Sequence, residues 1–137
     1  MANFKLQVIS PDRIFYEGDV EMVEVRTTEG EVGIYAEHIP LTAIIAPGIL
    51  RIHENGEVKE AALLSGFIEI TKKKVTILAE SCEWPEEIDV HRAEEAKARA
   101  ERRLRGEEGQ VNELRAELAL RRSLTRLSLV NEDHRNA

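Results

Sequence analysis

Hydrophobic and polar residues alternate along roughly the first 80 positions of the chain, with the period of two that half-buried β-strands show. Phe4, Leu6 and Val8 set this pattern at the start. Asn55 and Gly56 stand between two short apolar runs, which is a strong signal for a two-residue hairpin turn. Short strands separated by turn residues predict an all-β sandwich or barrel of about nine or ten strands.

The pattern changes after Trp84 and Pro85. From there to the end the chain is rich in Ala, Glu, Leu and Arg, which is a composition typical of helices. Glycine interrupts this half at Gly106 and Gly109. We therefore expect two helices joined by a short loop, and hence an antiparallel hairpin.

The two halves define the predicted fold, which is α+β. Residues 1–84 are expected to form an N-terminal β-sandwich, and residues 85–137 a C-terminal two-helix hairpin. The first helix should begin after Asp89, a good N-cap, and end near Arg105, and the second should begin near Gln110. Because short isolated helices are marginal in water, the hairpin must pack against the sandwich, against itself or against a partner, and all three stay open.

Composition narrows the class of protein. A chain of 137 residues suffices for one compact core and an appendage. The net charge of −7 argues against nucleic acid as a partner, because neutralising phosphates needs a basic surface. The charge is uneven, since residues 1–87 hold 8 Lys or Arg against 16 Asp or Glu, whereas residues 88–137 hold 11 against 10. No stretch suits a membrane helix or a signal peptide, so we expect a soluble protein, and the single Cys82 excludes an internal disulfide.

Arginines of the helical half share one face of each helix. At about 100° per residue, each of two sets of three falls within about 40°. The sets are Arg92, Arg99 and Arg103 on the first helix, and Arg115, Arg122 and Arg126 on the second. If the two faces meet, these guanidinium groups repel one another unless an anion lies between them. ATP carries about four negative charges on oxygens that match the guanidinium fork, so we expect the closed hairpin and bound ATP to stabilise each other.

Several motifs occur in an order and spacing that resemble the epsilon subunits of bacterial F-type ATP synthases. In the sandwich half they are Ser10–Arg13, Tyr16–Gly18, Glu29–Ile34, His38–Leu41, Gly66–Ile70 and Val75–Glu80. In the helical half they are Ile88–Ala93 and Arg115–Leu120. The resemblance covers nearly the whole chain and lies in the collinear spacing more than in any one motif. Two departures are Ala36 with Glu37, where the family often has Pro and Gly, and Ser65, where it often has a second Gly.

The resemblance implies a fold, a set of partners and a location. The fold would be a ten-stranded β-sandwich followed by the hairpin. The sandwich would dock on the gamma subunit of the central shaft and on the c-ring of the membrane rotor, and the hairpin would face the alpha/beta catalytic head. The chain would be a non-catalytic regulatory subunit, peripheral on the cytoplasmic face of the bacterial plasma membrane. ATP would be its regulatory ligand, and whether Mg²⁺ accompanies it stays open.

The resemblance also places an ATP-binding site around the start of the first helix. The family's nucleotide motif covers Ile88, Asp89, Arg92 and Ala93, with Glu83 just before it. We expect Ile88 and Ala93 to contact adenine and Asp89 to accept a hydrogen bond from its amine. Phosphate contacts are expected from Arg92, Arg99, Arg122 and Arg126, with Arg103 and Arg115 as further members. The chain has no glycine-rich phosphate loop and nothing that positions a water for attack, so we expect binding without hydrolysis. His53, His91 and His134 are scattered, so we expect no metal site.

Simpler hypotheses stand beside this one. Asp89 also suits a plain N-cap, and arginines on a charged helix are usually solvated. The chain could be a structural adaptor whose hairpin binds no nucleotide, or an enzyme with a substrate near His38 and His53, although no paired carboxylates accompany these histidines. On the leading hypothesis the hairpin folds with ATP, and without it extends toward the catalytic head and inhibits ATP hydrolysis.

Overall fold

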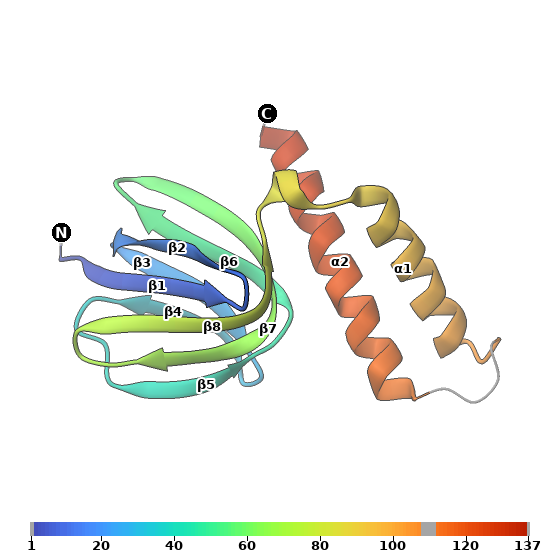
Figure 1. Cartoon of the computed structure of the whole chain (residues 1–137), viewed down its shortest axis with the longest axis horizontal. Coiled ribbons are helices and arrows are strands. Elements are labelled where there is room, and N and C mark those ends of the chain that lie inside the picture. The colour runs from blue at the N-terminus through green and yellow to red at the C-terminus, as the bar shows by residue number, and fades with distance from the viewer. Residues whose placement is uncertain (1, 108–111, 137) are drawn as a thin grey trace. The chain divides into compact units, whose positions relative to one another are not determined.

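The computed structural model describes residues 2–107 and 112–136, with side chains described as far as Asn131. The chain divides into two compact units, Met1–Glu83 and Trp84–Ala137 (Figure 1). The first unit is built of strands and the second of helices.

Eight strands make up the described part of the first unit. They are β1 (Phe4–Ser10), β2 (Arg13–Val20), β3 (Met22–Thr27), β4 (Gly30–Tyr35), β5 (Leu41–Ile45), β6 (Gly48–Glu54), β7 (Glu57–Ile70) and β8 (Lys74–Glu83). The alternation seen in the sequence sets their faces. In β1, Leu6 and Val8 are buried while Lys5 between Phe4 and Leu6 is exposed.

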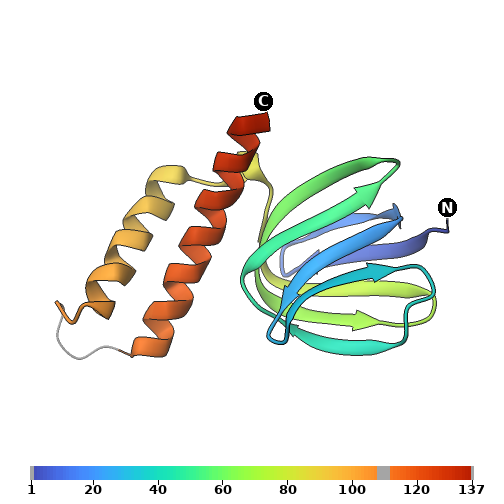
Figure 2. The ribbon, with the colours of Figure 1, turned by 180° about the vertical axis from the view of Figure 1, so that it is seen from behind.

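Hydrogen bonding closes these strands around one core. They join in the order β2-β1-β8-β7-β5-β3-β4, and β6 pairs with both β3 and β7, so the sheet folds back on itself (Figures 1 and 2). The β1–β8 pair is parallel, whereas the neighbouring pairs are antiparallel. Large aliphatic side chains fill the space between the layers, and the largest fully buried ones are Leu6, Ile34, Leu50, Ile52, Leu63, Leu64, Ile68 and Ile77. Burying each such side chain stabilises the fold by roughly 1.5–3 kcal/mol.

Strand β7 is fourteen residues long and has an irregularity near its middle. Its first half pairs with β6 and its second half with β5, and its register against β8 shifts at Ser65 and Gly66. Gly66 has φ +149, and a Cβ atom there would overlap the carbonyl oxygen of Leu78. A glycine bulge therefore lets one strand serve both layers. The predicted fold class is confirmed, and the described part of the sandwich has eight strands rather than ten. One of the two missing strands is explained by β7, which continues through its bulge as a single strand.

The second unit is a helical hairpin. A short 3₁₀ helix, η1 (Pro85–Glu87), precedes α1 (Val90–Leu104) and α2 (Glu113–Asn136). The two α-helices lie side by side and run in opposite directions (Figures 1 and 2), as predicted. Gln110, where the second helix is expected to begin, lies outside the described residues. Within the described ranges, neither helix has the length and apolar character needed to cross a membrane.

Candidate functional site

Small residues lie on one face of each helix of the hairpin. They are Ala93 and Ala100 on α1, and Ala116 and Ser123 on α2, and all four are at most 3% exposed. The members of each pair are seven residues apart, which places them on one side of their helix. Small side chains let packed helices approach closely. The arginines that flank these residues are thereby brought near the other helix.

Side-chain caps hold the start of both helices. Oδ1 of Asp89 accepts a hydrogen bond from the backbone N–H of Arg92 at 3.0 Å. Oδ1 of Asn112 accepts the equivalent bond from Arg115 at 3.1 Å. Asp89 is thus an N-cap, as the simpler hypothesis holds. The residue is exposed, and its other carboxylate oxygen has no hydrogen-bond partner among the described residues.

The predicted adenine-contacting residues gather at the start of α1. Ile88, between η1 and α1, and Ala93, in the first turns of α1, are both buried, while Asp89 and Arg92 are exposed. Glu83 is the last residue of β8 and belongs to the other unit, so its role stays a prediction.

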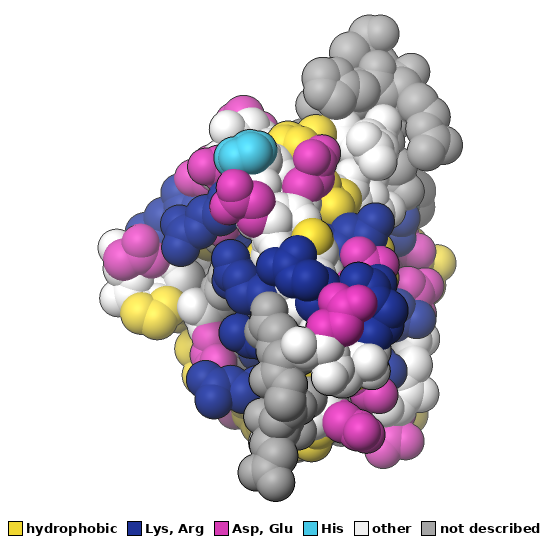
Figure 3. Space-filling model, turned by 90° about the vertical axis from the view of Figure 1, so that its right-hand side faces the viewer, with side chains coloured by type: hydrophobic (Ala, Val, Ile, Leu, Met, Phe, Trp, Pro, Cys, Tyr) yellow, Lys and Arg dark blue, Asp and Glu magenta, His cyan; other side chains and the backbone are white. Residues whose placement is uncertain are grey.

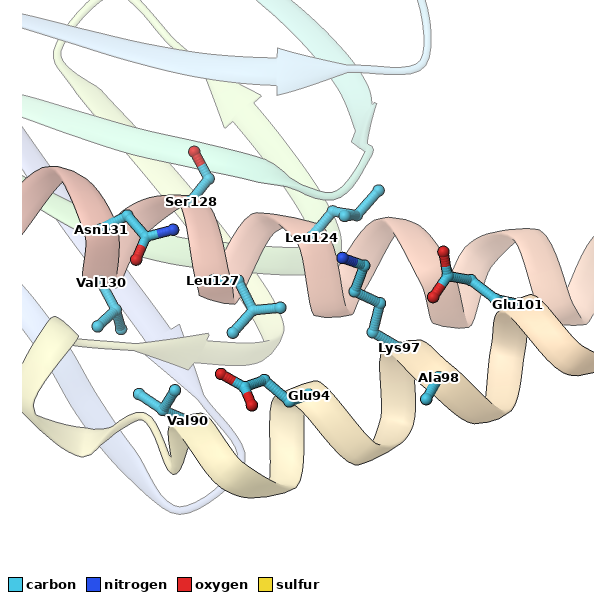
Figure 4. Close-up of a pocket in the computed structure, with 10 residues that line it drawn as sticks. All are labelled: Val90, Glu94, Lys97, Ala98, Glu101, Leu124, Leu127, Ser128, Val130 and Asn131. Atoms are coloured by element: carbon cyan, nitrogen blue, oxygen red, sulfur yellow. The ribbon is translucent and has the colours of Figure 1, made fainter.

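The register of the two helices follows from the residues that face one another across the hairpin. Figure 4 shows Val90 opposite Val130, Glu94 opposite Leu127, and Lys97 near Leu124. Two residues further along α1 is Arg99, and two residues back along α2 is Arg122. Because the helices are antiparallel, these two arginines stand at the same level of the hairpin.

The two arginine sets lie on the same side of the hairpin. Each set is about 90° from the small-residue face of its helix, in the same rotational sense, and for antiparallel helices this directs both to one side. Figure 3 shows Lys and Arg side chains gathered in a patch, with acidic side chains among and around them.

The arginines differ in their surroundings. Arg92, Arg99 and Arg115 are exposed, whereas Arg103, Arg122 and Arg126 are half-buried. Arg103 and Arg126 each have an interaction partner. The Nε atom of Arg122 is buried and has no hydrogen-bond partner within the described part of the chain. An unpaired buried donor is costly, so this atom is suited to an acceptor supplied by a ligand.

A groove of about 680 Å³ is lined by residues of both helices (Figure 4). Glu94 and Glu101, which line it, are about 180° around α1 from the arginines, so the groove lies on the side of the hairpin away from both arginine sets. Ala98 and Leu127 are among the residues that line it, and the carboxylates of Glu94 and Glu101 lie along it. None of the predicted nucleotide-binding residues is among the described residues that line it. This groove is not visible in the sequence. Leu124 and Leu127 nevertheless indicate an apolar face that differs from the side carrying both arginine sets, which we call the arginine face.

The sandwich carries an apolar row on its outer surface. It runs across five neighbouring strands and consists of Ile44, Phe67, Leu78, Ile9 and Ile14, each paired with the next. Ile9 is half-buried, and the other four are between 39% and 59% exposed. Alternation predicts that such positions face solvent, but their meeting in one row depends on strand pairing and is not visible in the sequence. A contiguous exposed apolar surface indicates a docking site.

The histidines considered for an enzyme have local partners. Nδ1 of His38 lies 2.9 Å from the carbonyl oxygen of Ile39, and Nε2 of His53 lies 2.8 Å from Oε2 of Glu24. Across the described residues no group of three or more His, Cys, Asp or Glu side chains is arranged to hold a metal ion.

Comparison with known proteins points to one family. A family model for the ATP synthase delta/epsilon chain β-sandwich domain matches residues 3–85, and one for its long α-helix domain matches residues 86–131. A protein of Caldanaerobacter subterraneus named ATP synthase epsilon chain is 48% identical over 130 residues, which cover 94% of each chain. A protein of Shouchella clausii with the same name is 48% identical over 129 residues, covering 94% of this chain and 96% of its own.

Solved structures agree with these relatives. A chain in the cryo-EM structure of the Euglena gracilis mitochondrial ATP synthase, OSCP/F1/c-ring in rotational state 1, superposes with a TM-score of 0.79 at 25% identity. The match covers 93% of the present chain and 81% of that chain. A chain of the Tetrahymena thermophila central stalk and c-ring structure shares the fold, with a TM-score of 0.59 and 15% identity.

Proposed function

Because the chain belongs to the ATP synthase delta/epsilon chain family, we propose that it is an ATP-responsive regulatory subunit of the central stalk of a bacterial ATP synthase. Its sandwich docks on the rotating parts of the enzyme, and its helical hairpin binds ATP. Membership of the family confirms the resemblance stated above, and with it that the chain is a non-catalytic subunit of a rotary ATP synthase.

The apolar row supports docking of the sandwich on the gamma subunit of the shaft. Its five side chains from β5, β7, β8, β1 and β2 form a continuous surface that a long helix could cover. Removing this apolar surface from water supplies most of the driving force for such an association.

One end of the sandwich supports docking on the c-ring of the rotor. Leu41, which begins β5, pairs with Ile70, which ends β7, so the loop at residues 36–40 and the turn at residues 71–73 emerge beside each other. Ile39 at the tip of that loop is 78% exposed, and Lys72 and Lys73 are exposed in the turn. An apolar tip beside basic side chains fits a rotor surface at the cytoplasmic face of the membrane.

The arginine face supports ATP binding. By the register of the neighbouring Lys97 and Leu124, Arg99 and Arg122 stand at the same level on the same side of the hairpin. The Nε atom of Arg122 is buried and has no hydrogen-bond partner among the described residues. Two guanidinium groups so placed repel each other, whereas a polyphosphate between them attracts both. The juxtaposition of Arg99 and Arg122 is the observation that carries the proposal of ATP binding.

Regulation follows from this coupling. ATP stabilises the folded hairpin because it binds that state better than an open one, and its removal lets the helices separate and extend toward the alpha/beta head. The extended helices inhibit ATP hydrolysis there. Residues 88–137 hold 11 Lys or Arg against 10 Asp or Glu, so the helical half lacks the negative charge of the sandwich half. The helices are therefore better suited than the sandwich to bind an acidic surface.

Calorimetry on the full chain tests ATP binding, with ATP alone and with ATP and Mg²⁺ in separate titrations. We expect one ATP per chain and at least a tenfold weaker affinity for Arg99→Ala and for Arg122→Ala, since each charge-assisted bond is worth about 1.5–3 kcal/mol. Arg121→Ala is the matched control, because Arg121 is exposed and lies off the arginine face. The absence of heat up to millimolar ATP from a folded protein would exclude the proposal.

Fluorescence transfer tests the switch separately. Labels are placed on cysteines introduced at Val90 and Asn131, which lie at the same end of the hairpin, after Cys82 has been replaced by Ala. ATP should raise the transfer efficiency. If ATP binds tightly but the transfer efficiency does not change, the hairpin binds nucleotide without changing its conformation, and the proposed switch is wrong.

A further inference from the structure

The two helices of the hairpin carry the same pattern, displaced by 23 positions. In both the pattern reads Arg-Ala-Glu-x-Ala-x-x-Arg, then a small residue, two others and Arg. It covers Arg92–Arg103 on α1 and Arg115–Arg126 on α2. The resemblance extends upstream, where Ile88 and Asp89 correspond to Val111 and Asn112. Val111 lies outside the described residues.

The structure realises this repeat as an approximate two-fold symmetry. The corresponding small residues, Ala93 with Ala116 and Ala100 with Ser123, are buried on both helices. The corresponding caps, Asp89 and Asn112, each accept a hydrogen bond from the N–H three residues on, at 3.0 and 3.1 Å. Antiparallel helices with the same face are related by a local two-fold axis.

The axis passes between Arg99 and Arg122. These two residues correspond in the repeat. Lys97 and Leu124 lie near each other in Figure 4, and this register puts Arg99 and Arg122 at the same level of the hairpin. Asp89 is ten residues before Arg99, and Asn112 is ten residues before Arg122. At 1.5 Å per residue the two caps therefore lie on opposite sides of the axis and roughly 30 Å apart along the hairpin.

We propose that the arginine face is a duplicated site in which Asn112 marks a second base-binding end, so that a dinucleoside polyphosphate occupies both halves. The inference rests on the proposed ATP site, which is one of these halves. A mononucleotide with its base at Asp89 brings its phosphates to the central Arg99 and Arg122 and leaves the far half empty. A chain of about four phosphates between two nucleosides is long enough, when extended, to reach from one cap to the other.

The two ends differ in the hydrogen bond that they offer a base. Oδ1 of each cap is used by the helix, so Asp89 presents its second carboxylate oxygen, an acceptor, whereas Asn112 presents its amide group, a donor. Asp89 therefore pairs with an exocyclic amine, as on adenine. Asn112 pairs with a ring or carbonyl acceptor, of which guanine offers O6 and N7. The best ligand of the class joins adenosine to guanosine.

The central arginines supply the independent sign of a ligand. Nε of Arg122 is buried without a partner in the described part of the chain, directly at the axis. The same polyphosphate that satisfies it there is flanked on either side by Arg103 and Arg126, which correspond in the repeat.

Calorimetry on the full chain tests the inference with three ligands: ATP, diadenosine tetraphosphate and adenosine-guanosine tetraphosphate. We expect one dinucleotide per chain, bound at least tenfold tighter than ATP, with the adenosine-guanosine form the tighter of the two. Binding of the second base is intramolecular once the first is held, which is the source of the gain.

Asn112→Asp is the decisive variant, because Asp is an equally good cap but presents an acceptor. In this variant diadenosine tetraphosphate should bind tighter than adenosine-guanosine tetraphosphate, while the affinity for ATP should change by less than threefold. Ser128→Asp adds the same charge on the groove side and should leave the order unchanged. If ATP binds but neither dinucleotide binds tighter, or if Asn112→Asp weakens all three ligands equally, the duplicated site is wrong and the ATP site stands. If no ligand binds, both proposals fail.

Discussion

The core of the sandwich and the facing sides of the two helices differ in the size of many of their buried side chains. The sandwich core consists of large aliphatic residues such as Leu50 and Ile77, whereas the buried residues on the facing sides of the helices include Ala100 and Ser123. Large residues bury more apolar area, so burial of side chains contributes more to the free energy of unfolding of the sandwich. Small residues bury less apolar area, so we expect the hairpin to be the less stable unit. They also let the flanking arginines of the two helices approach one another, which favours binding of an anion. Mutations should therefore act mainly on folding in one unit and mainly on ligand binding in the other.

The largest effect is expected where the sandwich backbone cannot yield. Gly66→Ala places a Cβ atom against the carbonyl oxygen of Leu78 in a region of φ that other residues avoid. We expect the free energy of unfolding to fall by about 4 kcal/mol, measured by urea denaturation of the full chain. Gly56→Ala is the control: its φ is also positive, at +79, but its Cβ would meet nothing within 4 Å, so it should cost about 1–2 kcal/mol. Equal losses would mean that strain alone, without the contact, sets the cost.

The same logic predicts a smaller effect in the hairpin. Ala100→Leu inserts a large side chain between packed helices and should cost about 2 kcal/mol. It should also weaken ATP binding, because the two arginine sets are pushed apart. Ala98→Leu is the matched control on the same helix, since Ala98 lines the open groove and has room for the larger side chain. Denaturation and calorimetry on both variants make the comparison. Loss of ATP affinity in Ala98→Leu alone would place the ligand in the groove instead.

The local structure of both units is predictable from the sequence, but the meeting of distant residues is not. The alternation at Phe4, Leu6 and Val8 and the turn at Asn55 and Gly56 depend on neighbours in the chain, and so does the cap at Asp89. These features can therefore be predicted from local patterns in the sequence.

Pairing between distant strands follows other rules. The parallel β1–β8 pair joins the two ends of the sandwich unit, and the row through Ile44, Phe67 and Leu78 exists only once β5, β7 and β8 are in register. The helical wheel likewise places Arg99 and Arg122 on their faces, but it does not give the antiparallel register that brings them to one level. Those features depend on the packing of the whole unit.

Two substitutions of Asp89 distinguish its role as a helix cap from its proposed role in ATP binding. Asp89→Ala removes the hydrogen bond to Arg92 and should cost about 1 kcal/mol of hairpin stability as well as ATP affinity. Asp89→Asn keeps the cap but replaces the free oxygen by a donor, so helix content measured by circular dichroism should stay constant while ATP affinity falls about tenfold. Unchanged ATP affinity in Asp89→Asn would reduce this residue to a cap.

The smallest effect is expected at a polar contact on the sandwich surface. Tyr16 Oη donates a hydrogen bond to Glu54 Oε2 at 2.8 Å, and this bond, with a further one from Lys59, holds the pKa of Glu54 below its ordinary value of 4.5. A carboxyl whose pKa is lower in the folded than in the unfolded chain stabilises the fold above that ordinary value. The contribution is lost as the pH falls through the lowered pKa.

Tyr16→Phe should therefore reduce the free energy of unfolding by about 0.5–1 kcal/mol at pH 7, and by less as the pH is lowered below 4.5. Tyr35→Phe is the control, because Tyr35 is exposed and no hydrogen bond of its hydroxyl is found within the described residues. Urea denaturation at pH 7 and at several values below pH 4.5 measures the difference. A deficit of constant size across that range would show that the Tyr16 hydroxyl stabilises the sandwich independently of the charge on Glu54.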